Sequence, residues 1–328
     1  MHDYPESARR ADHGRNGQVQ LQFGDAQEQA SALVGWNQDY LQLGAGPFQG
    51  TLHLAQAPGI RLFVEQLHQP VLQDGALPRG VLALGVPLQA AGTGVFCGTA
   101  CGADTLHVFS GAAGFEFRSS PRHAMLGIEV QLAPADAVHT ADDGASPPPR
   151  AGGWHMPQPL ASQVRSQMRA LFESACRHPE VFGQAPVRAA ATDFLLQAMA
   201  SAGIGASGLR NTNTCNHWAL VQQARALARA QHEQPLTVAQ LCQTLGVSRR
   251  TLQNGFQQVL GIGPLAYLKA MRLRQARHAL QQGAAVSEAA TACGFWHFGH
   301  FARDYASMFG ERPSETLRRP GAWPAPPH

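Results

Sequence analysis

The chain has 328 residues, 44% of them hydrophobic, which is enough to bury the cores of two domains and excludes a disordered or collagen-like protein. Its net charge is +3. Residues 1–211 contribute −4 (13 Lys+Arg, 17 Asp+Glu), and residues 212–328 contribute +7 (12 Lys+Arg, 5 Asp+Glu). This uneven distribution indicates a polyanionic partner for the C-terminal third alone. No apolar run approaches the roughly 20 residues of a membrane span and the N-terminus is polar, so we expect a cytoplasmic protein.

The first part of the chain is predicted to be a disordered N-terminus followed by a β-rich domain. Residues 1–24 are polar and rich in His, Arg, Asp and Gly, so we expect disorder there. From 25 to 135, short apolar runs alternate with Gly/Pro turns at a spacing of about 8–15 residues, which is typical of a sandwich or barrel. These runs are 50–68, 80–88, 104–111, 114–119 and 124–132.

Two linkers and a helical segment are predicted to follow. Residues 136–159 are rich in Pro, Gly and Asp and predict a linker. Over 160–205, apolar residues such as Val164 and Met168 recur at helical spacing, so we expect helices there, and we assign dimerisation to them. Residues 206–216 predict a second linker, which leads to an all-α domain over 217–319.

The C-terminal domain contains the same pattern twice. The first copy spans 236–264 and the second spans 286–313; we call them the first and second motifs. Gly246 returns 48 residues later as Gly294, whereas Gly261 returns 49 residues later as Gly310, so the second motif has one inserted residue. Each copy predicts a helix, a tight turn and a second helix.

One amphipathic helix is predicted between the two motifs, over residues 264–282. Its expected length is roughly 28 Å at 1.5 Å per residue. Successive major-groove turns of duplex DNA lie about 34 Å apart. The helix is therefore long enough to place two recognition helices in neighbouring turns of one groove.

In the first motif, the residue types fit a DNA recognition helix. Thr237 and Ser248 are predicted to cap the two helices, and Gly246 supplies a left-handed turn. Leu252, Phe256 and Val259 share a face that we expect in the core. The other face carries side chains suited to guanine and adenine edges: Arg249, Arg250, Gln253 and Asn254. A merely solvated helix face is the alternative, which the repeat disfavours.

The second motif is less conventional. Phe295, Phe301, Tyr305 and Phe309 are predicted to form its core, while His297, His300 and Arg303 face DNA. Phe298 allows two interpretations, contact with a thymine methyl group or packing inside the protein, and packing is favoured. Trp296 is likewise predicted to pack. Further arginines are predicted to contact phosphates: Arg272, Arg274, Arg277, Arg312, Arg318 and Arg319.

The pattern GF-x8-DY-x3-FG-x2-P-S over 294–314 resembles the AraC/XylS family of bacterial transcription regulators, and the resemblance covers residues 217–319. Within it, 241–273 and 294–305 are most similar to the activators of ethanolamine-utilisation operons, while Phe298–Gly299 departs from the general family pattern. The resemblance implies an activator that binds promoter DNA and RNA polymerase as a homodimer. It also implies a cupin-like β-barrel sensing domain, with ethanolamine and adenosylcobalamin as effectors.

The sequence identifies no effector site within the β-rich domain. Neither an HxH metal pair nor a DxHxxG cobalamin motif occurs. Some polar residues could line a pocket, but outward-facing strand positions are the favoured interpretation: His53, His68, His107, His123, Glu65 and Glu116. An amine would need a carboxylate or an aromatic cage, for which Trp36, Phe63, Glu65 and Glu116 are candidates by chemistry alone.

Two alternative functions stay open at this point. One is an AraC-type regulator of another catabolic operon that senses a different small molecule. The other is an enzyme fused to a DNA-binding module, with an alkyl-accepting thiol at Cys97, Cys101 or Cys176. Because the six cysteines show neither CxxC nor Cys/His metal spacing, we predict no enzyme, no catalytic residue and no metal site.

Overall fold

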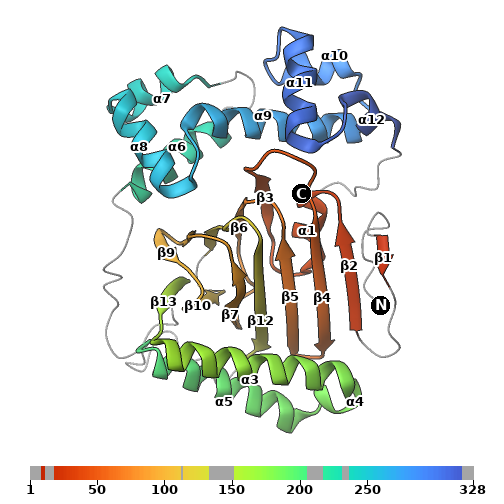
Figure 1. Cartoon of the computed structure of the whole chain (residues 1–328), viewed down its shortest axis with the longest axis vertical. Helices are drawn as coiled ribbons and strands as arrows, with labels where there is room; N and C mark the ends of the chain where they lie inside the picture. Colours follow the sequence, from red (N-terminus) through yellow and green to blue (C-terminus); the bar gives the residue numbers. More distant parts are fainter. Residues whose placement is uncertain are drawn as a thin grey trace. The chain divides into compact units, whose positions relative to one another are not determined.

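The computed structural model describes residues 9–11, 18–111, 114–132, 151–204, 217–230 and 236–319. These residues form two compact units, a β-rich unit that holds most of the first 214 residues and a helical unit formed from Cys215 onward (Figure 1). Among the described residues, no helix has the length and apolar content to cross a bilayer.

The β-rich unit contains two antiparallel sheets, one of eight strands and one of five. In spatial order the larger sheet comprises β1 (Arg9–Ala11), β2 (Gln18–Phe23), β4 (Gly50–Ala57), β5 (Ile60–Leu67), β12 (His123–Gln131), β7 (Val81–Ala90), β10 (Thr105–Ser110) and β13 (Gly152–His155). The smaller sheet comprises β3 (Asp39–Gln42), β6 (Val71–Gly75), β11 (Phe115–Arg118), β8 (Gly94–Phe96) and β9 (Thr99–Cys101). A short helix, α1 (Ala26–Ala32), precedes β3.

Aromatic side chains fill the space between the two sheets. Phe109 of β10 contacts Phe115 of β11 with ring centroids 4.9 Å apart, and Phe96 of β8 contacts His107 of β10 at the same separation. Alternate residues of one sheet therefore point at the other, as in a sandwich. A cupin-like barrel is not confirmed, because the described strands form two separate sheets rather than one closed sheet.

Helices pack against the opposite face of the larger sheet and lie across the lower ends of its strands in the view of Figure 1. They are α3 (Gln158–Arg177), α4 (Pro179–Phe182) and α5 (Ala185–Ser201). Met168 and Leu195 of these helices join a core cluster with Leu84 and Ile128 of the sheet. The apolar faces of α3 and α5 are thus occupied within the chain, so a dimer through this segment has to use their other faces.

Three segments differ from the prediction. Arg9–Ala11 and Gln18–Phe23, both placed in the disordered N-terminus, form the paired strands β1 and β2. In β2 glutamines alternate with apolar residues, and this alternation puts Leu21 and Phe23 in the core. Gly152–His155, placed in the linker 136–159, forms β13 against β10. Its glycines resembled a linker, yet a Cβ at Gly153 would come within 3.1 Å of the Thr105 side chain, so the close strand contact favours glycine there. The predicted linker 206–216 lies outside the described residues.

The helical unit consists of α6 (Trp218–Ala230), α7 (Val238–Leu245), α8 (Arg249–Leu260), α9 (Pro264–Gln281), α10 (Val286–Ala292), α11 (Phe298–Phe309) and α12 (Pro313–Arg318). The 18-residue helix α9 is about 27 Å long. It lies between α6–α8 at one end and α10–α12 at the other (Figure 1). This is the arrangement that the repeated sequence pattern predicts.

Candidate nucleic-acid interface

Local hydrogen bonds set the turn of the first motif. The Thr237 hydroxyl oxygen accepts from the Gln240 backbone N–H at 3.2 Å, and the Gln240 side-chain oxygen accepts from the Thr237 N–H at 2.9 Å. Gly246 ends α7 in the left-handed conformation, with φ 64° and ψ 29°. Ser248 then starts α8, its hydroxyl oxygen accepting from the Thr251 N–H at 3.1 Å. The two predicted caps and the glycine turn are all present.

Helix α8 buries one face and exposes the other. Leu252, Phe256 and Val259 are fully buried, and the Phe256 ring lies 5.5 Å from Tyr267 of α9, measured between centroids. On the exposed face are the predicted base-contacting residues Arg249, Arg250, Gln253 and Asn254. The arginines occupy the first turn of α8, whereas the Gln253 amide lies close to Gly263 at the start of α9.

The second motif repeats this geometry with a longer turn. The Glu288 carboxylate accepts from the Ala285 N–H at 3.3 Å at the start of α10, and Gly294 has φ 76°. Three residues separate Gly294 from α11, against two between Gly246 and α8, so the inserted residue lies in this turn. His297 is the N-cap of α11, and Gly310 ends the helix in the left-handed conformation.

The core of the second motif is built from the predicted aromatic residues. Phe301 and Tyr305 are fully buried, while Phe295 and Phe309 pack against them at centroid distances of 5.1 and 4.7 Å. The predicted DNA-facing residues His297, His300 and Arg303 are all exposed.

Two aromatic residues correct the sequence interpretation. Trp296 is 73% exposed and Phe298 is 51% exposed, although packing inside the protein was the favoured prediction for both. The physical reason is that Phe295 and Phe301 already fill the space between α10 and α11. The longer turn leaves Trp296 outside this core.

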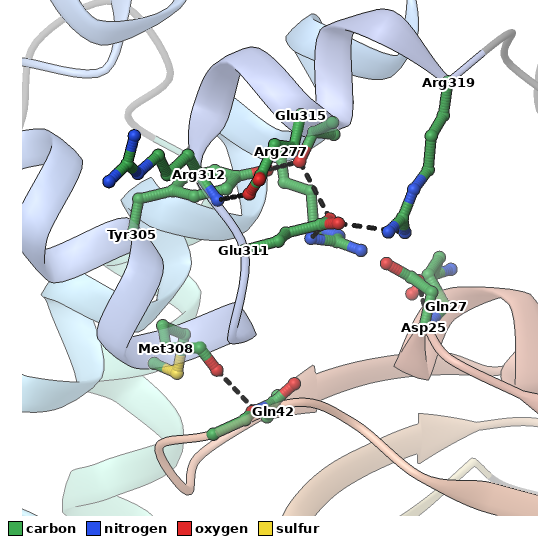
Figure 2. Close-up of polar contacts among 12 residues, drawn as sticks. Asp25, Gln27, Gln42, Arg277, Tyr305, Met308, Glu311, Arg312, Glu315 and Arg319 are labelled. Carbon is green, nitrogen blue, oxygen red and sulfur yellow. Dashed lines mark hydrogen bonds and ion pairs between the residues drawn. The ribbon is translucent and has the colours of Figure 1, made fainter.

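The predicted phosphate contacts also need correction. Arg277 is only 7% exposed; its guanidinium donates to the Glu311 carboxylate at 2.7 Å and lies 4.6 Å from the centre of the Phe309 ring (Figure 2). It is therefore a core residue and cannot reach a phosphate. Arg312, Arg318 and Arg319 are exposed, whereas Arg272 and Arg274 are half-buried.

Sequence reasoning missed Glu311, which organises the end of the second motif. Besides Arg277, the Glu311 carboxylate is paired with Arg319 at 2.9 Å (Figure 2). It also accepts a hydrogen bond from the Thr316 hydroxyl at 2.9 Å. Thr316 in turn shares a hydrogen bond of 2.8 Å with the Tyr305 hydroxyl. These contacts connect α9, α11 and α12, so they hold the second recognition helix in place. The sequence signal that could have identified it is the position of this acidic residue, between Gly310 and Pro313.

In the β-rich unit, four residues predicted to face outward are buried: His107, His123, Glu65 and Glu116. The first three point from the larger sheet toward the smaller one, where His107 and His123 meet the Phe117 ring and Glu65 meets Gln73. His53 is half-buried with its ring 5.0 Å from that of Phe172, and His68 is exposed.

The candidate amine cage is only partly assembled. Trp36 and Phe63 meet edge to face with centroids 5.4 Å apart. The Glu65 carboxylate, however, accepts hydrogen bonds from the Tyr40 hydroxyl at 2.7 Å and from the Gln29 and Gln73 amides at 3.0 Å. Burial raises its pKa above the ordinary value, and these neutral donors act in the opposite direction. Glu65 is thus already satisfied within the protein.

The remaining titratable groups do not form a reactive site. Burial lowers the pKa of His107 to about 3 and that of His123 to about 4, so both are neutral at physiological pH. Burial raises the pKa of the Cys97 and Cys101 thiols to about 12, which leaves them protonated and weakly nucleophilic. Within the described ranges no cluster of His, Cys, Asp or Glu could hold a metal ion.

The C-terminal domain is similar to known proteins. Residues 241–319 match a family model described as a helix-turn-helix domain. The chain is 44% identical over 103 residues to the "Probable thc operon regulatory protein" of Rhodococcus erythropolis, covering 30% of this chain and 31% of that protein. It is 36% identical over 117 residues to the "HTH-type transcriptional regulator ArgR" of Pseudomonas aeruginosa, covering 35% of each.

A crystal structure of a probable AraC family transcriptional regulator from Rhodopseudomonas palustris is 42% identical, covering 31% of this chain and 97% of that chain, with a TM-score of 0.30. The chain spans about a third of the length of the curated relatives it matches. Both curated relatives are named as regulatory proteins.

Proposed function

We propose that this protein is a sequence-specific DNA-binding regulator of transcription of the AraC type, a proposal supported by the match of residues 241–319 to a helix-turn-helix family model. The observation that carries the proposal is the pairing of two recognition helices on one scaffold. Both α8 and α11 pack against α9 through buried aromatic residues and keep a polar, exposed face. The unit that bears them also carries the excess positive charge of the chain.

Each recognition helix has an assigned set of DNA-contacting residues in this proposal, and Arg303 is the base-contact candidate of the second motif. On α8 they are Arg249, Arg250, Gln253 and Asn254; on α11 and its N-cap they are His297, His300 and Arg303. An arginine can donate two hydrogen bonds to a guanine edge, and Gln or Asn can pair with an adenine edge. The exposed Arg312, Arg318 and Arg319 are suited to phosphates, which position the protein without adding sequence preference.

The test starts from the full chain and a random duplex library. Duplexes that the wild-type protein enriches define its operator, and gel shifts then measure affinity for the operator and for single-base variants. Arg250→Ala and Arg303→Ala should each weaken operator binding by about 1–3 kcal/mol and relax the preference at one base pair. The affected base pairs should fall in different halves of the operator, since the two arginines lie on different recognition helices.

Arg169→Ala is the matched control, since Arg169 is an exposed arginine on α3 of the β-rich unit and its loss changes net charge equally. It should leave both affinity and sequence preference unchanged. Equal affinities for Arg250→Ala, Arg303→Ala and wild type would remove these helices from the interface. Failure of the wild-type protein to enrich any sequence would overturn the proposed function.

We further propose that the β-rich unit senses a small molecule and that the protein activates an operon as a homodimer with RNA polymerase. Ethanolamine with adenosylcobalamin is one effector hypothesis, supported only by the resemblance of the recognition segments. Calorimetry with ethanolamine, with adenosylcobalamin and with both tests it, and sedimentation over a concentration series tests the dimer. Transcription from a promoter beside the enriched operator distinguishes activation from repression.

A regulator of another catabolic operon is the second proposal, and one observation favours it. The Rhodococcus relative, which is 44% identical over 103 residues, is named for a thc operon. Calorimetry distinguishes the two proposals. If the protein regulates another operon, ethanolamine should give no heat of binding, with or without adenosylcobalamin.

A further inference from the structure

The start of α11 presents an apolar surface where α8 presents charge. Trp296 is the most exposed of the large hydrophobic residues in the described part of the chain, and Phe298 exposes half of its side chain. Both helices have 12 residues, follow an extended N-cap and end at a left-handed glycine. In this alignment Phe298 takes the position of Arg249, and Gly299 takes that of Arg250.

The fold of the helical unit does not require an aromatic residue or a glycine at these positions. The core beneath is filled by Phe301, which aligns with Leu252 of α8. A Cβ added at Gly299 would meet no atom within 4 Å, so neither packing nor a left-handed backbone explains this glycine. Glycine inside a helix costs about 0.5–1 kcal/mol relative to alanine, and its known use is to let the backbone approach a partner closely.

The chemistry of the major groove supplies a match for this surface. Polar base edges dominate the groove, and its one apolar group is the C5-methyl of thymine, which phenylalanine can contact. His297 and His300 lie on either side of Phe298 in the chain, and their ring centroids are 6.1 Å apart. Their exposed imidazoles can donate hydrogen bonds to phosphates. Duplex DNA satisfies both kinds of side chain at once.

We propose that α11, besides the base contact assigned to Arg303, recognises the C5-methyl group of a thymine in its half of the operator, which Phe298 contacts. Trp296 extends the same apolar surface, and Gly299 allows the first turn of the helix to lie deep in the groove. The inference rests on the proposed function, since it names what the second motif recognises. It predicts that the half of the operator bound by α11 is recognised partly through an apolar contact, which the charged and amide side chains of α8 do not offer in the other half.

The experiment removes only the C5-methyl group of each thymine and keeps the base pair. Each thymine of the enriched operator is replaced singly by deoxyuridine, and gel shifts with the full chain measure each duplex. One thymine in the half assigned to α11 by Arg303→Ala should lose about fourfold in affinity for the wild-type protein, the value expected for one buried methyl group. For Phe298→Ala the same replacement should have no effect, whereas Phe298→Leu should retain part of it.

Leu265→Ala is the matched control, because Leu265 is an exposed apolar residue of α9 in the same unit. It should show the wild-type loss at that thymine. The inference is overturned if Phe298→Ala keeps the full deoxyuridine effect, or if no thymine in that half responds in the wild-type protein. It is also overturned if Phe298→Ala leaves DNA binding unchanged and alters only self-association or transcription. That result would mean that the exposed surface of Trp296 and Phe298 binds protein instead of DNA. Circular dichroism confirms that each variant folds.

Discussion

At the scale of single residues, Glu311 and Asp304 give a direct comparison of a buried and a surface ion pair. The Glu311 carboxylate and its partner Arg277 are about a tenth exposed, whereas Asp304 and its partner Lys269, 3.1 Å apart, are 35% and 45% exposed. Removing one member of a buried pair leaves an uncompensated charge in the interior. We therefore expect Glu311→Ala to destabilise the helical unit by about 3 kcal/mol.

Asp304→Ala should cost less than about 1 kcal/mol, because solvent screens its pair. Urea unfolding of the full chain, followed by far-ultraviolet circular dichroism, measures both variants. A loss for Glu311→Ala no larger than that for Asp304→Ala would show that the contacts of Glu311 with Arg277, Arg319 and Thr316 do not stabilise the second motif. Figure 2 shows why the larger value is expected, since Glu311 lies among all of these contacts.

At the scale of elements, local signals determined what could be predicted. The caps at Thr237 and Ser248 and the turn at Gly246 follow from residue type alone, and Leu252 and Phe256 follow from helical spacing. The exposure of Trp296 does not follow, because aromatic residues are usually buried and the direction of a side chain in an irregular turn depends on tertiary packing. The inserted residue in the second turn was visible in the sequence, but its effect on Trp296 was not.

Gly246 in the turn of the first motif and Gly299 in the recognition helix α11 should respond in opposite ways to alanine. Gly246 has a positive φ, so Gly246→Ala should destabilise the helical unit by about 1 kcal/mol. Gly299 is helical and faces open space, so Gly299→Ala should stabilise it by about 0.5–1 kcal/mol while weakening operator binding. Thermal unfolding and gel shifts of both variants check this. Tighter operator binding by Gly299→Ala would contradict a close approach of α11 to DNA.

At the scale of the whole molecule, the repeated motif made one unit predictable from sequence, whereas the stacked layers of the other unit did not allow its buried faces to be predicted. The tandem motifs made the helical unit predictable, whereas β7 is buried over its first seven residues and shows no alternation. Such a strand has α3 and α5 on one face and the smaller sheet on the other, and the sequence does not reveal which element covers which face. That is why His107 and His123 were interpreted as outward-facing residues.

The burial of these two histidines makes the stability of the β-rich unit depend on pH. In the unfolded chain each imidazole returns to its ordinary pKa near 6.5, whereas in the folded protein the pKa is about 3 for His107 and about 4 for His123. The unfolded state therefore binds more protons below pH 6.5. Their contribution to stability is complete above that value and declines as pH falls toward the folded pKa values.

Each histidine should account for a loss of about 2 kcal/mol between roughly pH 7.5 and pH 5. His107→Gln and His123→Gln remove one titrating group each, so both variants should be less stable than wild type near pH 7.5 but decline less on acidification. Urea unfolding at the two pH values, followed by the fluorescence of the buried Trp36, measures the slope for this unit. Parallel declines for wild type and both variants would mean that these imidazoles become protonated without unfolding, and hence that the space between the two sheets admits water.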